Sequence, residues 1–279
     1  MAISGGIKVF DRSQCLGQDG AVIAASSGDS SSIRALDRSL VSYWRSVGSI
    51  DSITETITIT FNASKVINRI LLLDHNWKEF TVKYFSGGSY VNFASVLGID
   101  GSIASISETT FAEDSAYYEF APVATTSIQI TVTKTQVVDQ EKYINQIIAT
   151  TELGTLVGYP DVNGLDMTTN AREKKVLSGK IITMKSEKSL KFSLAFKNYP
   201  PSLSNDIDLM FSLWESDDTF LIWLCGGRRG SNYFRKQLRG FRLRDVICAQ
   251  TSAVINPDYS KNVFTLPINF TIKMNEAVD

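Results

Sequence analysis

The segment "TETITITF" (Thr54–Phe61) decides the fold class of this chain. Its isoleucine and phenylalanine residues alternate with threonines, so an extended strand would carry one apolar face and one polar face. β-Branched residues such as isoleucine and threonine also pack well on a pleated sheet. The segment therefore predicts a half-buried β-strand.

The same alternation recurs through the first half of the chain. "KVINRILLLD" (65–74) and "EFTVKYF" (79–85) follow directly, and "TTSIQITVTKT" (125–135) comes later. Turns rich in Gly, Ser, Asp and Asn separate these segments, which is typical of a β-sandwich or jelly roll. Helical spacing is confined to residues 31–44, where we expect one or two turns at most.

Alternation continues in the second half. "SLKFSLAF" (189–196) predicts a strand with Leu and Phe on its inner face, and the apolar run "TFLIWLCGG" (219–227) predicts a buried central strand. One amphipathic helix is expected near 205–216, where Asn205 is the candidate N-cap.

Turn residues gather near residues 150–164, and the balance of charge changes sign there. Residues 1–155 carry 11 Lys/Arg and 16 Asp/Glu, whereas residues 156–279 carry 17 and 13. We therefore predict a mainly β protein of two domains. Residues 1–155 would form a jelly roll, and residues 156–279 would form a β-rich domain with one packed helix.

Cysteine content indicates the compartment. Cys15, Cys225 and Cys248 are odd in number and form no C-x-x-C motif, so neither a disulfide framework nor a zinc site is expected. No secretory signal is visible, and no apolar run approaches the roughly 20 residues that span a bilayer. We expect synthesis in a reducing cytoplasm and no membrane insertion.

The inventory for catalysis is poor. His75 is the single histidine, and its neighbour Asp74 would point to the opposite face of a strand. No phosphate-binding glycine motif occurs, and no cluster of metal-ligating residues is evident. We therefore expect no catalytic residues, no metal and no cofactor, and hence no enzyme.

Two tryptophan segments supply the candidate ligand contacts. "SYWRS" (42–46) contains Trp44 and Arg45, and "DHNWKEF" (74–80) contains His75, Asn76 and Trp77. Both lie at ends of predicted strands, where loops carry binding residues. An indole flanked by hydrogen-bonding groups could stack on a sugar ring. The alternative is that both tryptophans are core residues at the rim of the sandwich.

The order of these segments resembles a known family. "ALDRSLVSYWRS", "ETITITF", "VINRILLLDHNWKEFTVKYFSGGSYVNF", "TTSIQITV" and "KYINQIIATTELG" are similar to the discoidin, or coagulation factor type C, galactose-binding-like domain over residues 20–155. The resemblance implies an eight-stranded jelly roll whose loops at one end bind glycans, lipids or protein. Its first-loop candidates are Asp37, Trp44 and Arg45. The cysteine pair that often ties the ends of such domains is absent.

The second half is similar to β-domains of bacteriophage tail and baseplate proteins. The likeness rests on "FLIWLCGG", "FRKQLRGFRLRDVICAQ" and "NPDYSKNVFTLPINFTIKMNEA". It implies a virion component, located in the tail, that is made in the host cytoplasm and released by lysis. Its partners would be other tail proteins in a multi-copy assembly. The jelly roll would then face either a host-surface glycan or a neighbouring subunit.

A basic run in the second half predicts an interface. Its seven members are Arg228, Arg229, Arg235, Lys236, Arg239, Arg242 and Arg244. An assembly contact, a solvated sheet face and a nucleic-acid surface would each explain the run. The net charge of −1 over the whole chain argues against nucleic acid. Arginine is enriched at protein interfaces, so we expect assembly contacts.

Three function classes follow from these features. We expect the chain to be a non-enzymatic structural component of a phage tail or phage-like contractile particle. A stand-alone lectin-like module is the alternative. An enzyme acting on glycans, with His75 or a carboxylate as its catalytic group, is the third.

Overall fold

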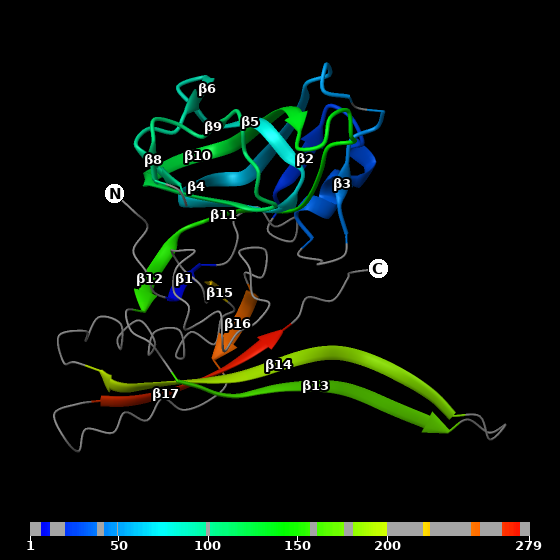
Figure 1. Cartoon of the computed structure of the whole chain (residues 1–279), viewed down its shortest axis with the longest axis vertical. Coiled ribbons are helices and arrows are strands. Elements are labelled where there is room, and N and C mark those ends of the chain that lie inside the picture. The colour runs from blue at the N-terminus through cyan, green and yellow to red at the C-terminus, as the bar shows by residue number, and fades with distance from the viewer. Residues whose placement is uncertain are drawn as a thin grey trace.

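The computed structural model describes residues 7–11, 20–37, 42–48, 50–98, 101–156, 161–175, 181–199, 220–223, 247–251 and 264–273. These residues form two antiparallel sheets (Figure 1), so the mainly β prediction is confirmed. The helix expected near 205–216 and the seven basic residues between 228 and 244 lie outside the described residues.

One sheet contains ten strands and builds the jelly roll. Its main path runs β3–β11–β4–β10–β5–β6, and β2, β7, β8 and β9 pair alongside it. The bounds are β2 (Val22–Ala25), β3 (Trp44–Arg45), β4 (Glu55–His75), β5 (Trp77–Ser86), β6 (Ser89–Asn92), β7 (Val96–Gly98), β8 (Gly101–Ile103), β9 (Ser107–Glu108), β10 (Ala116–Thr135) and β11 (Tyr143–Thr150).

The second sheet contains seven strands in the order β12–β1–β15–β16–β17–β14–β13. The bounds are β1 (Ile7–Phe10), β12 (Glu152–Leu156), β13 (Asp161–Lys175), β14 (Ile181–Tyr199), β15 (Phe220–Trp223), β16 (Ile247–Thr251) and β17 (Phe264–Lys273). In Figure 1, the parts of β13 and β14 that extend beyond β17 form a two-stranded arm. Strands expected at 189–196 and within 219–227 are therefore present as β14 and β15.

The pattern of 54–61 forms the start of β4 as expected. Ile57, Ile59 and Phe61 are buried, whereas the intervening threonines are partly or fully exposed. β10 pairs with this part of β4, and Ile128 and Ile130 of β10 join the same apolar core. Burial of one face against the opposite layer thus fixes the register of the two longest strands.

A short helix forms at the start of residues 31–44, where one or two turns at most are expected. It is a 3-10 helix, η2 (Asp29–Ala35), and residues 38–41 lie outside the described residues. Ile33, which the helical pattern places inward, is 48% exposed, whereas Ala35 and Leu36 are buried. The tighter 3-10 winding rotates successive side chains differently from an α-helix, which changes the residues that face the core.

The two sheets contact each other through a second apolar cluster. Its members are Phe10, Leu71, Leu73, Tyr117, Ile148, Leu221 and Trp223. They come from β1 and β15 of one sheet and from β4, β10 and β11 of the other. β12 follows β11 after a single residue, so the chain passes directly from one sheet to the other (Figure 1).

Candidate functional site

Three segments meet where β3, β4 and β11 come together. Ile144 of β11 pairs with both Trp44 of β3 and His75 at the end of β4, and Tyr143 pairs with Arg45. These pairings bring residues 42–48, 74–77 and 135–143 to one end of the jelly roll. Most residues predicted as ligand contacts therefore lie within one region.

Trp44 and Trp77 are core residues. Both indoles are 0% exposed, so neither can offer its face to a sugar ring. The Trp44 indole donates a hydrogen bond to the carbonyl of Ser27 at 3.1 Å. The structure therefore agrees with the alternative that both tryptophans are core residues, and they form no stacking platform. In β3, alternation turns Trp44 inward and Arg45 outward.

His75 is also part of the core. Its ring packs against Trp77, Phe80 and Phe111, with a stacked centroid separation of 5.4 Å to Phe111. Its Nδ1 accepts a hydrogen bond from the backbone N–H of Trp77 at 3.1 Å. Burial lowers the pKa of His75 to about 3, so the ring is neutral at physiological pH. A buried neutral imidazole contacts no ligand at this surface.

Asn76 has a structural role. Its side-chain nitrogen donates to the carbonyl of Glu141 at 2.8 Å, and its side-chain oxygen accepts from the backbone N–H of Tyr143 at 3.0 Å. Its backbone carbonyl accepts from the N–H of Gln136. Asn76 is 5% exposed, so the expected ligand contact is replaced by a clamp on the loop that enters β11.

Arg45 is exposed and lies at the centre of the site. Its guanidinium carbon is 5.1 Å from the ring centroid of Tyr143 and 5.5 Å from that of Tyr43. The two rings contact each other edge to face, with centroids 5.6 Å apart. Attraction between a guanidinium and aromatic faces restricts the motion of the Arg45 side chain, which is exposed to solvent.

Asp74 adds an acceptor beside these donors. Its Oδ2 accepts a hydrogen bond from the Tyr43 hydroxyl at 2.6 Å. The residue adopts a φ of 51°, which is uncommon for residues other than glycine, and its N–H donates to the Ser115 hydroxyl. Backbone strain of this kind gathers at functional sites. We name Tyr43, Arg45, Asp74 and Tyr143 the Arg45 cluster.

The electrostatics of the cluster keep Tyr143 neutral. Burial and then the Asp74 carboxylate raise the pKa of Tyr143, while Arg45 opposes this shift. At neutral pH the ring therefore keeps its hydroxyl proton. The Arg45 cluster thus combines one cation, one carboxylate and two hydroxylated rings.

Asp37 holds the segment that leads into the Arg45 cluster. Both of its carboxylate oxygens accept hydrogen bonds from the Ser42 hydroxyl, at 2.9 and 2.7 Å. The carbonyl of Ser42 in turn accepts from the Asn145 side chain at 2.6 Å. Asp37 and Asn145 therefore fix the start of the segment that carries Tyr43 and Arg45.

Gly28 determines the position of Arg45. Its φ is +60°, and a Cβ atom at this residue would overlap the carbonyl oxygen of Arg45. Only glycine tolerates both this conformation and this approach. The backbone of β3 can therefore lie where it does only because residue 28 has no side chain.

Of the six predicted ligand residues, the structure places only Arg45 on the exposed surface of the cluster. Tyr43, Asp74 and Tyr143 were missed by sequence reasoning. The alternation rule could have found Tyr43, since it flanks the buried Trp44. Tyr143 carries no such signal, because its contribution depends on the pairing of β3 with β11.

No group of three or more His, Cys, Asp or Glu in the part of the chain that the structure describes could hold a metal ion. No helix among the described residues is long and apolar enough to cross a membrane.

Comparisons with known proteins gave matches among solved structures. No family model matches the chain, and no curated protein matches it either. A chitosan-binding module from a chitosanase/glucanase of Paenibacillus sp. IK-5 is 16% identical, with a TM-score of 0.38 over 49% of this chain and 97% of that one. The family 32 carbohydrate-binding module of C. perfringens NanJ, in complex with galactose, is 14% identical, with a TM-score of 0.39 over 50% and 98%.

A further Clostridium perfringens module, in complex with GalNAc-β-1,3-galactose, is 13% identical, with a TM-score of 0.37 over 48% of this chain and 97% of that one. These three solved structures, each similar to about half of this chain, are carbohydrate-binding modules, and a putative alpha-L-fucosidase from Bacteroides thetaiotaomicron is similar to 48% of the chain. Because each TM-score is below 0.5, the function of this chain has to be inferred from its own residues.

Proposed function

We propose that this chain is a non-catalytic carbohydrate-binding protein that holds a glycan at the Arg45 cluster. The observation that carries the proposal is the exposed Arg45 guanidinium, which lies above the rings of Tyr43 and Tyr143. The role matches the lectin-like alternative more closely than the tail-component reading expected from the sequence.

The chemistry of the cluster suits a sugar. Sugar hydroxyls both donate and accept hydrogen bonds, so they need acceptors and donors placed close together. Arg45 supplies several N–H donors in a fixed plane, and the Asp74 carboxylate supplies acceptors. Tyrosine rings offer apolar faces for the C–H groups of a pyranose together with a polar hydroxyl. Ligand sites typically combine a small number of convergent polar groups with aromatic surface.

The positions of these groups are set before a ligand arrives. Tyr43 holds the Asp74 carboxylate, and the paired rings hold Arg45. Groups that are already ordered lose less conformational entropy on binding. A surface with this degree of order supports a binding role more than a merely solvated one.

A glycan array with the full chain tests the proposal. We expect binding to a defined set of sugars, and we expect Arg45→Ala and Asp74→Asn each to weaken it at least tenfold, since charge-assisted hydrogen bonds contribute about 1.5–3 kcal/mol each. Arg34→Ala, which removes an exposed arginine on η2, is the matched control and should bind normally. Absence of binding across a broad array would contradict the proposal.

A structural role in a phage tail is the second candidate. What supports it is β13, which ends the strand order of the seven-stranded sheet among the strands described and is 15 residues long. A long edge strand exposes backbone groups that can pair with another chain. In such a particle, the second domain would bind its neighbours and the jelly roll would face the host surface.

Immunogold electron microscopy of particles from the source culture tests this second role. Gold at a fixed position on tails is expected if the chain is a tail component. If no particle carries gold and the antigen is free in solution, the tail role is contradicted and the carbohydrate-binding role is the remaining candidate. The assembly role of the basic residues between 228 and 244 stays a prediction.

A further inference from the structure

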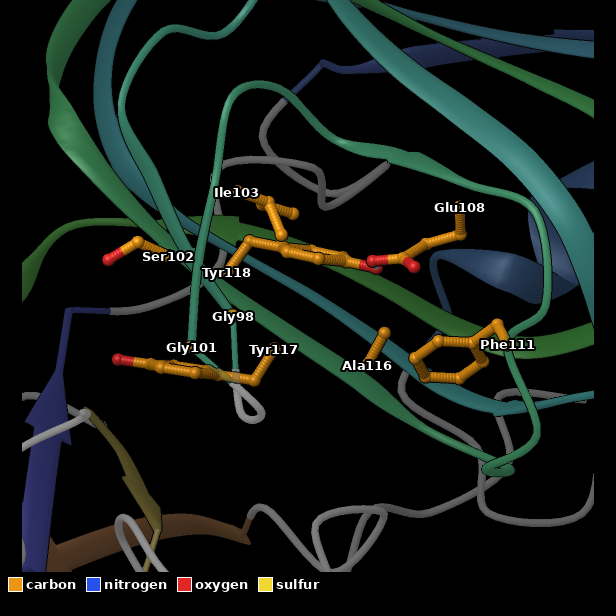
Figure 2. Close-up of a pocket in the computed structure, with 9 residues that line it drawn as sticks. All are labelled: Gly98, Gly101, Ser102, Ile103, Glu108, Phe111, Ala116, Tyr117 and Tyr118. Carbon is orange, nitrogen blue, oxygen red and sulfur yellow. Dashed lines mark hydrogen bonds between the residues drawn. The ribbon is translucent and has the colours of Figure 1, made fainter. Parts of the chain in front are cut away.

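A separate cavity lies between the β7–β8 hairpin and the start of β10 (Figure 2). Its volume is about 160 Å³. The rings of Phe111 and Tyr118 contribute to its walls, together with the side chains of Ile103 and Ala116. Figure 1 places β8 and β3 on opposite sides of the jelly roll, so this cavity is distinct from the Arg45 cluster.

Glycine keeps one wall of the cavity open. Gly98 pairs with Tyr118 across β7 and β10, and with Gly101 across β7 and β8. A Cβ at Gly98 would lie 3.8 Å from two carbon atoms of the Tyr118 ring and 3.7 Å from the carbonyl oxygen of Gly101. These are ordinary contact distances, so a methyl group would fit there without a clash but would occupy part of the cavity.

One carboxylate enters this mostly apolar space. Oε1 of Glu108 accepts a hydrogen bond from the Tyr118 hydroxyl at 3.0 Å, and in Figure 2 the two groups point toward each other. Burial and then the Glu108 carboxylate raise the pKa of Tyr118 above its usual value. The phenol is therefore the proton donor of this pair, and the second oxygen of Glu108 has no hydrogen bond among the described residues.

We propose that this cavity binds a small organic ammonium group. The Glu108 carboxylate lies at the hydroxyl end of Tyr118 and shares the cavity wall with Phe111, so charge and aromatic surface, which such a cation requires, occur together. The aliphatic walls accommodate its alkyl part. An engineered cavity of about 150 Å³ binds a molecule of the size of benzene, so the ligand has about five to eight non-hydrogen atoms.

The charge and the volume of the cavity also exclude other ligand classes. An anion would meet the Glu108 carboxylate, and a larger ring system would exceed the volume. A neutral alcohol of the same length would fill the apolar part and donate a hydrogen bond to Glu108, but it has no positive charge to pair with the carboxylate. It would also gain no attraction of a cation to the aromatic rings.

A nuclear magnetic resonance titration of the full chain tests the proposal. n-Butylammonium and 1-butanol have the same number of non-hydrogen atoms and differ in charge. We expect millimolar binding of n-butylammonium, with shifts in the amide signals of Gly98 and residues 116–118. 1-Butanol should bind about tenfold more weakly.

Two variants separate charge from space. Glu108→Gln should weaken n-butylammonium about tenfold and leave 1-butanol unchanged. Gly98→Ala should weaken both, because it occupies the cavity and keeps the carboxylate. Thermal melting confirms that each variant is folded. Arg45→Ala should bind n-butylammonium normally, so failure of the glycan proposal and failure of this one are distinguishable.

Two results would overturn the proposal. One is absence of n-butylammonium binding to the unmodified chain at millimolar concentration. The other is equal binding of the amine to the Glu108→Gln variant. Titration with N-acetyl-lysine amide and with glucosamine then distinguishes a protein source of the ammonium group from a sugar source, according to which binds more tightly.

Discussion

Lys8 on β1 places its Nζ atom 3.0 Å from Oε1 of Glu119 on β10, and so joins the seven-stranded sheet to the jelly roll. Arg69 and Glu152 complete the network: Lys8 lies 3.4 Å from Glu152, and Arg69 donates to Glu152 at 2.7 Å. The Tyr117 hydroxyl accepts from Arg69 and donates to Glu119, each at 3.0 Å. Two cations and two carboxylates thus balance in a mostly buried junction.

Replacing Lys8 should destabilise the chain. The side chain is 1% exposed, so Lys8→Met leaves the carboxylates with one cation fewer in a poorly solvated place. Removal of one partner from a buried ion network costs about 3 kcal/mol. Urea unfolding measures the loss. Lys134→Met, which breaks the exposed pair with Glu79, is the control and should give no measurable change.

His75 should make stability depend on pH. Its pKa falls from 6.5 to about 3 because the folded chain buries it. The unfolded chain therefore binds a proton below pH 6.5 that the folded chain does not. Stability should decrease as the pH falls from 6.5 toward 3, by at most about 1.4 kcal/mol per pH unit from this residue. His75→Phe should reduce that slope by one proton, and an unchanged slope would contradict the account.

The two buried tryptophans should respond unequally to replacement by phenylalanine. Trp44→Phe removes the hydrogen bond to Ser27, whereas the Trp77 indole nitrogen has no hydrogen-bond partner among the described residues. Both variants leave space in the core. We expect the free energy of unfolding to fall about 1 kcal/mol further for Trp44→Phe, which is the net value of one hydrogen bond. Equal losses in paired unfolding curves would contradict the assignment of these environments.

Two glycines with the same φ separate strain from steric overlap. Gly28 and Gly48 both have a φ of +60°. A Cβ at Gly48 meets nothing within 4 Å, whereas a Cβ at Gly28 overlaps the backbone of Arg45. Gly48→Ala should cost about 1 kcal/mol from conformation alone. Gly28→Ala should cost clearly more and should also displace Arg45, which a comparison of melting temperatures and glycan binding would show.

The strands of the jelly roll could be predicted because their alternation is local. Residues 54–61 and 125–135 each contain enough of the pattern to fix an apolar face. The sequence does not predict that β1 belongs to the seven-stranded sheet. The four residues 7–10 carry little periodicity, and the pairing of 8–10 with residues 221–223 depends on contacts between distant parts of the chain. The division into 1–155 and 156–279 stays a prediction.

The sequence predicts which segments form the candidate site, but it does not predict which residues the site contains. The segments around residues 44 and 75 do lie together. The sequence pattern, however, makes Trp44 and Trp77 the candidate ligand contacts, because aromatic residues often bind sugars. The period of the strand decides otherwise, since it turns Trp44 inward and Arg45 outward. Tyr143 and the unusual backbone of Asp74 became part of the site only through tertiary structure.

The most direct test of the account is a titration of the sugar that binds best on the array into the isotope-labelled full chain, followed by nuclear magnetic resonance. We predict that the largest shifts occur at the amides of Tyr43, Arg45 and Tyr143, together with the Arg45 side-chain N–H, and that they vanish in Arg45→Ala. Shifts confined to another surface, or unchanged in that variant, would contradict the assignment of the Arg45 cluster as the glycan site.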